Sequence, residues 1–290
     1  MNISISILII FVVLLIALFM KYKYIELFMK YKYIELFSQN KQSIPKIIHK
    51  VYIEHSMKLP TELSKNIKKA HESWSLLNPG YKMKFYSGDD CIKYLQQHFG
   101  SEYVDIFNNI NAYAGKCNFF RMCVVYNEGG WYSDWKQVCL KPIHEWVHKD
   151  VEFVGFYDIW FRFLETEKKH CGQNATFGSI PKHPILKKTI DLIKVNVKNK
   201  YYGKGALYTT GVCVYGKAIH ETLPKLKPNS YQFGSHIKYN KYPYMTMNNI
   251  KVIQHKCESC DTSQNWENGN NYNKLWKNRN YYGEKENVKS

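Results

Sequence analysis

Arginine is scarce in this chain of 290 residues: only Arg121, Arg162 and Arg279 occur among its 41 lysines and arginines. Acidic residues number only 24, so the formal net charge is +17. A positive balance favours anionic partners such as phosphates, acidic lipids or nucleic acid. No nucleic-acid recognition motif accompanies the charge, and we therefore expect no nucleic-acid partner.

The sequence also lacks a second zinc-type cysteine pair. Residues 257–260, Cys-Glu-Ser-Cys, have the spacing of one pair, but a structural zinc site needs four ligands. We predict free thiols or one late disulfide there. Cys117, Cys123, Cys139 and Cys213 sit inside apolar segments and are predicted to be buried thiols, which argues against a secreted disulfide framework.

A long apolar run does occur at the N-terminus. Residues 3–20 carry no charge and are about long enough to cross a bilayer, so we predict a transmembrane anchor over residues 1–20. Residues 21–43 then form a spacer in which one nonapeptide is repeated in tandem, at 20–28 and 29–37. Lysines follow the anchor and do not precede it, which predicts a single-pass membrane protein with its catalytic domain on the cytoplasmic side. Tyrosines between these lysines suit an anionic membrane surface.

Beyond the spacer, short apolar runs alternate with helix-like segments. The pattern predicts a strand at 44–53, a helix at 61–78, a strand at 81–87 and a helix that ends at Phe99. This order predicts an α/β domain over 44–275, with a Rossmann-type, mostly parallel sheet flanked by helices and a mobile tail at 276–290. Ligands of such sheets lie at the carboxyl ends of strands. Asp158 follows a strand-like run and is a candidate for that edge.

Four polar side chains on adjacent elements are candidates for one ligand site. Residues 112–128 read as a helix ended by Gly129 and Gly130, and residues 131–138 read as a strand. Asn118 and Arg121 share a helix face because they are three residues apart. Asp134 and Lys136, two residues apart on the predicted strand, would point the same way.

The segments 114–121 and 126–134 resemble the glycosyltransferases whose sugar-binding region contains a DXD motif. That group includes family 32 mannosyl- and galactosyltransferases and, more distantly, the clostridial glucosylating toxins. The resemblance covers most of residues 44–266. It implies a GT-A fold and a retaining transfer of a hexose from a UDP- or GDP-sugar to a glycan, lipid or protein acceptor.

The resemblance also implies residue roles. Arg121 would contact the sugar side, Tyr52 would stack on the nucleotide base, and Asp134 would meet hydroxyl groups and an Mn²⁺ or Mg²⁺ ion, with His255 near the metal. Together with Asp158, the candidate substrate-binding residues are Tyr52, Asn118, Gly129, Gly130, Asn174, Thr210, Gly211 and Trp266.

Two positions depart from the family pattern. Lys136 stands where the second aspartate of the motif is expected, and Asn118 stands where an aspartate usually precedes the arginine. An ammonium group cannot coordinate a cation. Three explanations stay open. Lys136 itself neutralises the diphosphate, which we prefer and which makes Arg121, Asp134 and Lys136 the catalytic candidates. Alternatively, Asp134 and His255 hold a metal that phosphate oxygens complete, or the protein is a pseudoenzyme that binds nucleotide-sugars without turnover.

Overall fold

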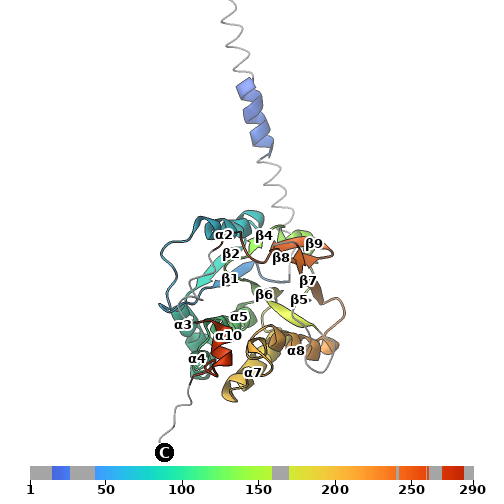
Figure 1. Cartoon of the computed structure of the whole chain (residues 1–290). Coiled ribbons are helices and arrows are strands. Elements are labelled where there is room, and N and C mark those ends of the chain that lie inside the picture. Colours follow the sequence, from blue (N-terminus) through green and yellow to red (C-terminus); the bar gives the residue numbers. More distant parts are fainter. Residues whose placement is uncertain are drawn as a thin grey trace, which may run out of the picture. The chain divides into compact units, whose positions relative to one another are not determined.

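The computed structural model describes residues 15–26, 43–158, 170–239, 242–258, 260 and 270–283. The chain divides into two compact units, residues 1–41 and 42–290. In the first unit, residues 15–26 form a helix (Figure 1). Nowhere in the described part of the chain is there a helix of the length and apolar character that crossing a membrane requires. Residues 1–14 of the predicted anchor and residues 27–42 of the spacer lie outside the described residues.

A nine-stranded mixed sheet forms the centre of the second unit, in the order β2-β1-β3-β6-β5-β7-β8-β9-β4 (Figure 1). Its strands are β1 (Ile47–Val51), β2 (Lys82–Tyr86), β3 (Gly130–Ser133), β4 (Val138–Cys139), β5 (Phe153–Asp158), β6 (Cys171–Ser179), β7 (Tyr231–Tyr239), β8 (Tyr242–Met247) and β9 (Ile250–Gln254). Only β1–β2, β1–β3 and β5–β7 pair in parallel, and the other neighbours are antiparallel.

The predicted mostly parallel sheet is therefore wrong for the second half of the domain. The first two predicted strands exist, and they do pair in parallel. Later strands reverse direction because the connections are short: two residues join β7 to β8, and two more join β8 to β9. Connections of that length can join only antiparallel neighbours, since a parallel crossover needs a dozen or more residues.

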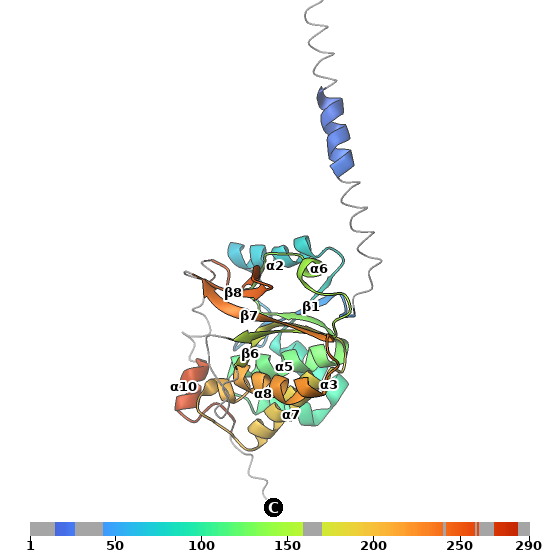
Figure 2. The same ribbon diagram turned by 90° about the vertical axis from the view of Figure 1, so that its right-hand side faces the viewer.

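Helices cover both faces of the sheet (Figure 2). The helices of the unit are α2 (Lys65–Leu77), α3 (Gly88–Phe99), α4 (Ser101–Asn108), α5 (Tyr113–Glu128), α6 (Ile143–Trp146), α7 (Pro184–Lys198), α8 (Val212–Thr222) and α10 (Tyr272–Lys277), with short 3₁₀ turns at Ala206–Tyr208 and Leu223–Lys225. One apolar core packs α5, α7 and α8 against one face, and a second core containing Trp74, Trp131 and Trp146 fills the other face. The two cores cover opposite faces of the sheet, and this packing holds in place the strand ends next to the site.

The helix–glycine–strand unit is confirmed in its first half only. Helix α5 ends at Gly129 and Gly130, whose φ angles of 69° and 92° lie in the region that glycine tolerates best. The predicted strand 131–138 is wrong at residues 134–137, because Asp134 to Gln137 form a turn closed by the Gln137 amide, which donates to the Asp134 carbonyl at 3.1 Å. Asp134 and Lys136 thus lie in a turn and not on a strand.

The C-terminal segment belongs to the domain. Residues 271–283 continue the fold, with Tyr281 and Tyr282 only 2% and 4% exposed and an isolated bridge from Tyr282 to Ile110. The predicted mobile tail therefore begins too early, since two buried aromatic side chains hold the chain to α5 and the loop before it. Residues 284–290 lie outside the described residues.

Two disulfides occur in the described residues. Cys171 at the start of β6 is bonded to Cys213 in the first turn of α8, so the prediction of a free thiol at Cys213 is wrong. The cause is the close packing of α8 on β6, which brings the two Cα atoms within 4.5 Å. Cys257 is bonded to Cys260, as the alternative of one late disulfide predicted. Cys117, Cys123 and Cys139 are free cysteines, also as predicted.

Candidate functional site

The turn after β3 is held through nearly every backbone group. The Asp134 carbonyl accepts a hydrogen bond from the Lys50 ammonium of β1 at 3.1 Å, and the Asp134 amide donates to the Ala175 carbonyl of β6 at 2.9 Å. The Trp135 carbonyl accepts from His71 of α2 at 3.0 Å. Since these partners come from three different elements, the turn is fixed against the sheet and α2 alike.

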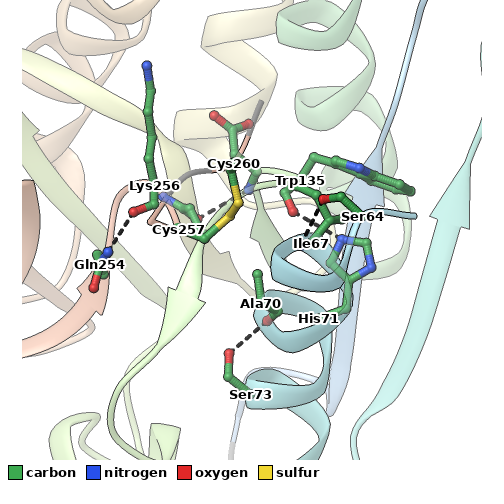
Figure 3. The surroundings of a disulfide bond; sticks show 12 residues. Ser64, Ile67, Ala70, His71, Ser73, Trp135, Gln254, Lys256, Cys257 and Cys260 are labelled. Carbon is green, nitrogen blue, oxygen red and sulfur yellow. Dashed lines mark hydrogen bonds between the residues drawn. A yellow bond between two sulfur atoms is a disulfide. The ribbon is translucent and has the colours of Figure 1, made fainter. Parts of the chain in front are cut away.

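The second half of the turn is anchored in the same way. The Cys257 amide donates to the Lys136 carbonyl at 2.8 Å, and the Trp74 indole donates to the Gln137 carbonyl at 3.0 Å. Figure 3 shows the Cys257–Cys260 disulfide beside α2, with the His71 ring next to the Trp135 carbonyl. The turn is therefore a preorganised platform for the side chains of Asp134 and Lys136.

Arg121 and Asp134 meet as an ion pair between α5 and this turn. An Arg121 Nη1 atom lies 3.1 Å from Asp134 Oδ1, and the guanidinium lies over the Tyr132 ring with its carbon 4.3 Å from the ring centre. Arg121 also donates to the Asn174 carbonyl at 2.7 Å. The Arg121 side chain is 7% exposed and the Asp134 side chain 36%, so the carboxylate is accessible from the cavity while the guanidinium is buried behind it.

Two cavities adjoin at this ion pair. The first has a volume of about 250 Å³ and the second about 430 Å³. Both are lined by Ala114, Arg121, Asp134, His255 and Tyr272. The prediction that Asn118 and Arg121 share a face is confirmed, since both line the second cavity.

The first cavity combines aromatic rings with cationic groups. Tyr52 and Trp135 line it with their ring centres 5.0 Å apart and their planes tilted by 41°, and Lys136 and Lys256 line it as well. The Tyr52 hydroxyl donates to Glu54 at 2.9 Å, which leaves the ring face as the part of Tyr52 suited to stacking.

Asn118 and Asn174 line the second cavity, whereas Thr210, which was also predicted to bind substrate, lines neither cavity and is fully buried. Asn174 donates to the Asn118 side-chain oxygen at 3.1 Å, and Asn118 donates to Thr210 at 3.4 Å. Thr210 in turn shares a hydrogen bond of 2.7 Å with the Tyr281 hydroxyl. Such a chain of neutral donors and acceptors can orient the hydroxyl groups of a sugar.

A second polar cluster lies at the carboxyl end of β5, on the same cavity. Asp158, 2% exposed, accepts from or pairs with His236 Nδ1 at 3.3 Å, and the His236 and His255 rings lie 4.8 Å apart. Burial, with the neighbouring His236 adding to it, lowers the pKa of His255 to about 3. His255 is therefore a neutral ring at pH 7 and adds no charge to the site.

Some predicted site residues do not line either cavity. Gly129 and Gly130 lie at the opposite end of β3, where a Cβ atom on Gly129 would come within 2.7 Å of Pro181 and one on Gly130 within 2.7 Å of the Ile47 carbonyl. The prediction that they bind substrate is therefore corrected: these two glycines permit close backbone packing away from both cavities. Gly211 lines the second cavity as predicted, and Trp266 lies outside the described residues.

The side chains at the cavities do not fit the metal site that the motif implies. In the described part of the chain, no three His, Cys, Asp or Glu side chains converge as metal ligands. Asp134 Oδ1 already accepts from the Tyr132 hydroxyl at 2.8 Å and pairs with Arg121. Lys136 cannot ligate a cation, so the donor chemistry here differs from that of a two-aspartate motif.

Sequence reasoning missed four residues of the site, which are Lys50, Lys256, Tyr272 and Tyr281. Lys50 is fully buried below the turn, and its burial lowers its pKa to about 7. A lysine inside an apolar β-branched strand was the available signal. The other three residues follow the last strand, where no helix or strand pattern in the sequence indicated that they would reach the site.

Comparisons with known proteins match the part of the chain that contains this site. The family model described as "Glycosyltransferase sugar-binding region containing DXD motif" matches residues 64–152, which include α5 and the turn. An uncharacterized glycosyltransferase of Acanthamoeba polyphaga mimivirus is 29% identical over 143 residues, 49% of this chain and 53% of the relative. The chain thus spans about half the length of this curated relative.

Among solved structures, the chain matches the PaToxG glycosyltransferase at 18% identity and a TM-score of 0.42, over 68% of this chain and 79% of that one. Another is the UDP-bound glycosyltransferase domain from the YGT toxin, at 9% identity and a TM-score of 0.38 over 66% and 79%. The resemblance carried by the sequence is confirmed by the family model and the viral relative: the chain contains the sugar-binding region of the DXD-containing glycosyltransferases. Within the matched region, Lys136 stands in the place of the second aspartate.

Proposed function

We propose that this protein transfers a hexose from a UDP- or GDP-sugar to a hydroxyl group of a glycan, lipid or protein acceptor, with retention of configuration. One observation carries the proposal: Arg121 and Asp134, from a helix and a turn, meet at the junction of two cavities inside a glycosyltransferase sugar-binding region. A nucleotide-sugar has two unlike halves joined by a diphosphate. Two adjoining cavities with unlike walls suit such a ligand.

The first cavity suits the nucleotide half of the donor. Tyr52 and Trp135 offer ring faces for a base, and Lys136 lines the same cavity. The second cavity suits the hexose, since Asn118 and Asn174 line it with amide groups and Asp158 adds a buried carboxylate.

The chemistry demands positive charge at the junction. When the bond between the anomeric carbon and the diphosphate breaks, negative charge grows on the leaving phosphate oxygen. Arg121 is held in place by the Asn174 carbonyl and the Tyr132 ring, so its position needs no reorganisation during the reaction. Asp134 faces the cavity and can accept a hydrogen bond from a sugar or ribose hydroxyl.

A nucleotide-sugar-binding pseudoenzyme is the second candidate. The observation that favours it is the replacement of the second motif aspartate by Lys136, together with the neutral Asn118 in the sugar half. Both candidates need the same bound ligand, and they differ only in turnover.

The test is a panel of UDP- and GDP-sugars, with release of UDP or GDP and isothermal titration measured in parallel, in Mn²⁺ and in EDTA. We expect turnover of at least one donor, and we expect Asp134→Asn to lower it by about tenfold or more because a charged acceptor at the cavity is lost. Asp191→Asn, which removes an exposed ion pair on α7, serves as the matched control and should match the wild type. Binding without release would select the pseudoenzyme, and no binding of any donor would refute both.

Membrane anchoring through residues 1–20, with the catalytic unit on the cytoplasmic side, is a further part of the proposal and rests on the apolar run and the lysines after it. The two disulfides are of a kind more usual in oxidising compartments. Protease protection in sealed vesicles whose cytoplasmic face points outward decides which side of the membrane the catalytic unit occupies, since a cytoplasmic domain is then digested without detergent.

A further inference from the structure

Positive charge dominates the wall of the first cavity. Among its described lining residues, Arg121, Lys136 and Lys256 are cations, whereas Asp134 is the one carboxylate. His255 also lines this cavity. Three cations against one carboxylate leave two positive charges, which matches the charge of the diphosphate in a nucleotide-sugar.

Lys136 and Lys256 line the same cavity although 120 positions separate them in the sequence. The hydrogen bond from the Cys257 amide to the Lys136 carbonyl, 2.8 Å long, joins the turn to the segment after β9. The Lys256 carbonyl accepts from Gln254 at 2.7 Å, and the Cys257–Cys260 disulfide follows directly. Figure 3 shows the Lys256 side chain extending away from the disulfide and α2.

A divalent cation would meet unfavourable surroundings at this wall. It would bring two more positive charges to a surface that already carries a surplus of cations. Asp134 Oδ1 is committed to Tyr132 and Arg121, at 2.8 Å and 3.1 Å, and Lys136 occupies the position of the second carboxylate without any lone pair to offer.

We propose that Lys136 and Lys256 bind the diphosphate of the donor directly, and that this lysine pair takes the place of the divalent cation in nucleotide binding. The inference rests on the proposed function, because it assumes that the first cavity holds the nucleotide half of a nucleotide-sugar. Ammonium groups suit this role, since they act as compact positive centres with three donors each.

Isothermal titration of UDP, GDP and UMP tests the pair without relying on activity. In EDTA, the full-length wild-type protein should bind a nucleoside diphosphate, and Lys136→Ala should weaken that binding about tenfold, with Lys256→Ala acting in the same direction. UMP binding should change less than about twofold, because the second phosphate is the group that the lysines contact. Lys251→Ala, on β9 but outside both cavities, is the matched control.

Lys136→Asp gives a sharper contrast because it restores the two-aspartate motif. We expect this variant to lose diphosphate binding in EDTA by more than about tenfold and to regain it with Mn²⁺, while wild type is indifferent to the ion. Unchanged thermal unfolding shows that each variant is folded. Wild-type binding that requires Mn²⁺, with Lys136→Ala without effect, overturns the lysine pair and leaves the proposed function standing. Failure of UDP and GDP to bind under either condition overturns both.

Discussion

Replacing the buried Lys50 by methionine should change how the stability of the protein depends on pH. Lys50 is fully buried on β1, and its ammonium donates to Ser133 Oγ at 3.0 Å and to the Asp134 carbonyl at 3.1 Å. Burial lowers its pKa from 10.5 to about 7, and the opposing effect of Asp134 does not restore it. In the unfolded chain the same lysine keeps its proton up to about pH 10.

The sign follows from which state binds more protons. Between pH 7 and pH 10 the unfolded chain holds the Lys50 proton and the folded protein releases it, so folding stability rises with pH over this window. From pH 7 to pH 9 the gain is about 2 kcal/mol, since each full proton contributes about 1.4 kcal/mol per pH unit and release is half complete at pH 7. Lys50→Met has no such proton to release, so its stability lacks this rise.

The assay is urea unfolding of wild type and Lys50→Met at pH 7, 8 and 9. Other titrating groups, such as Lys116 with a pKa lowered to about 8 by burial, are common to both proteins and cancel in the difference. The variant should also keep UDP binding, because the remaining backbone groups of the turn retain their partners. If the free energy of unfolding depended on pH equally in the two proteins, the inference that buried Lys50 loses its proton near neutrality would be refuted.

Three further predictions concern the site and its support. Arg121→Met should lower the free energy of unfolding by about 1–3 kcal/mol in urea titrations, because the Asn174 carbonyl loses a charged donor and the partly exposed Asp134 carboxylate loses its ion-pair partner, whereas Arg279→Met, which removes stacking on an aromatic ring, should cost less than about 1 kcal/mol. Burial lowers the pKa of His49 from 6.5 to about 4, so its contribution to folding stability is complete above pH 6.5 and is lost as the pH falls toward 4. Between pH 6.5 and 4, the free energy of unfolding of His49→Asn should therefore fall by up to about 3 kcal/mol less than that of the wild type. Tyr281→Phe removes the hydroxyl that bonds Thr210 at 2.7 Å, so a UDP-sugar should lose about tenfold in affinity by isothermal titration while UDP itself is unchanged. Equal losses for both ligands would argue against a sugar role for the second cavity.

Local patterns in the sequence predicted the first half of the fold. The elements β1, α2, β2, α3 and α5 follow from apolar periodicity and from glycine pairs that end helices, because these signals depend on near neighbours. The antiparallel order of β7, β8 and β9 follows from two-residue connections. The direction of β6 depends on its pairing with β3, far back along the chain, and the sequence of β6 alone does not encode it. The bond between Cys171 and Cys213 was missed for the same reason, since it depends on how α8 packs on β6.

The candidate site was predicted in its centre and missed at its edges. Arg121 and Asp134 converge as expected, although Asp134 reaches the cavity from a turn and not from a strand. Lys256 follows the last strand and Tyr281 lies in the segment predicted as a tail, and only tertiary packing brings both to the cavities. Gly129 and Gly130 were wrongly predicted to bind substrate from the family pattern. Such a pattern shows where glycine is required, but it does not show whether a ligand or the backbone requires it.

The central claim is that the junction between the two cavities, at Arg121 and Asp134, receives the diphosphate of a nucleotide-sugar. A crystal structure of the full-length protein with a bound non-hydrolysable UDP-sugar tests it most directly. The account predicts the base against Tyr52, the diphosphate between Arg121 and Lys136, and the hexose beside Asn118. Density for the nucleotide in any other part of the molecule, with these cavities filled by water alone, would contradict it.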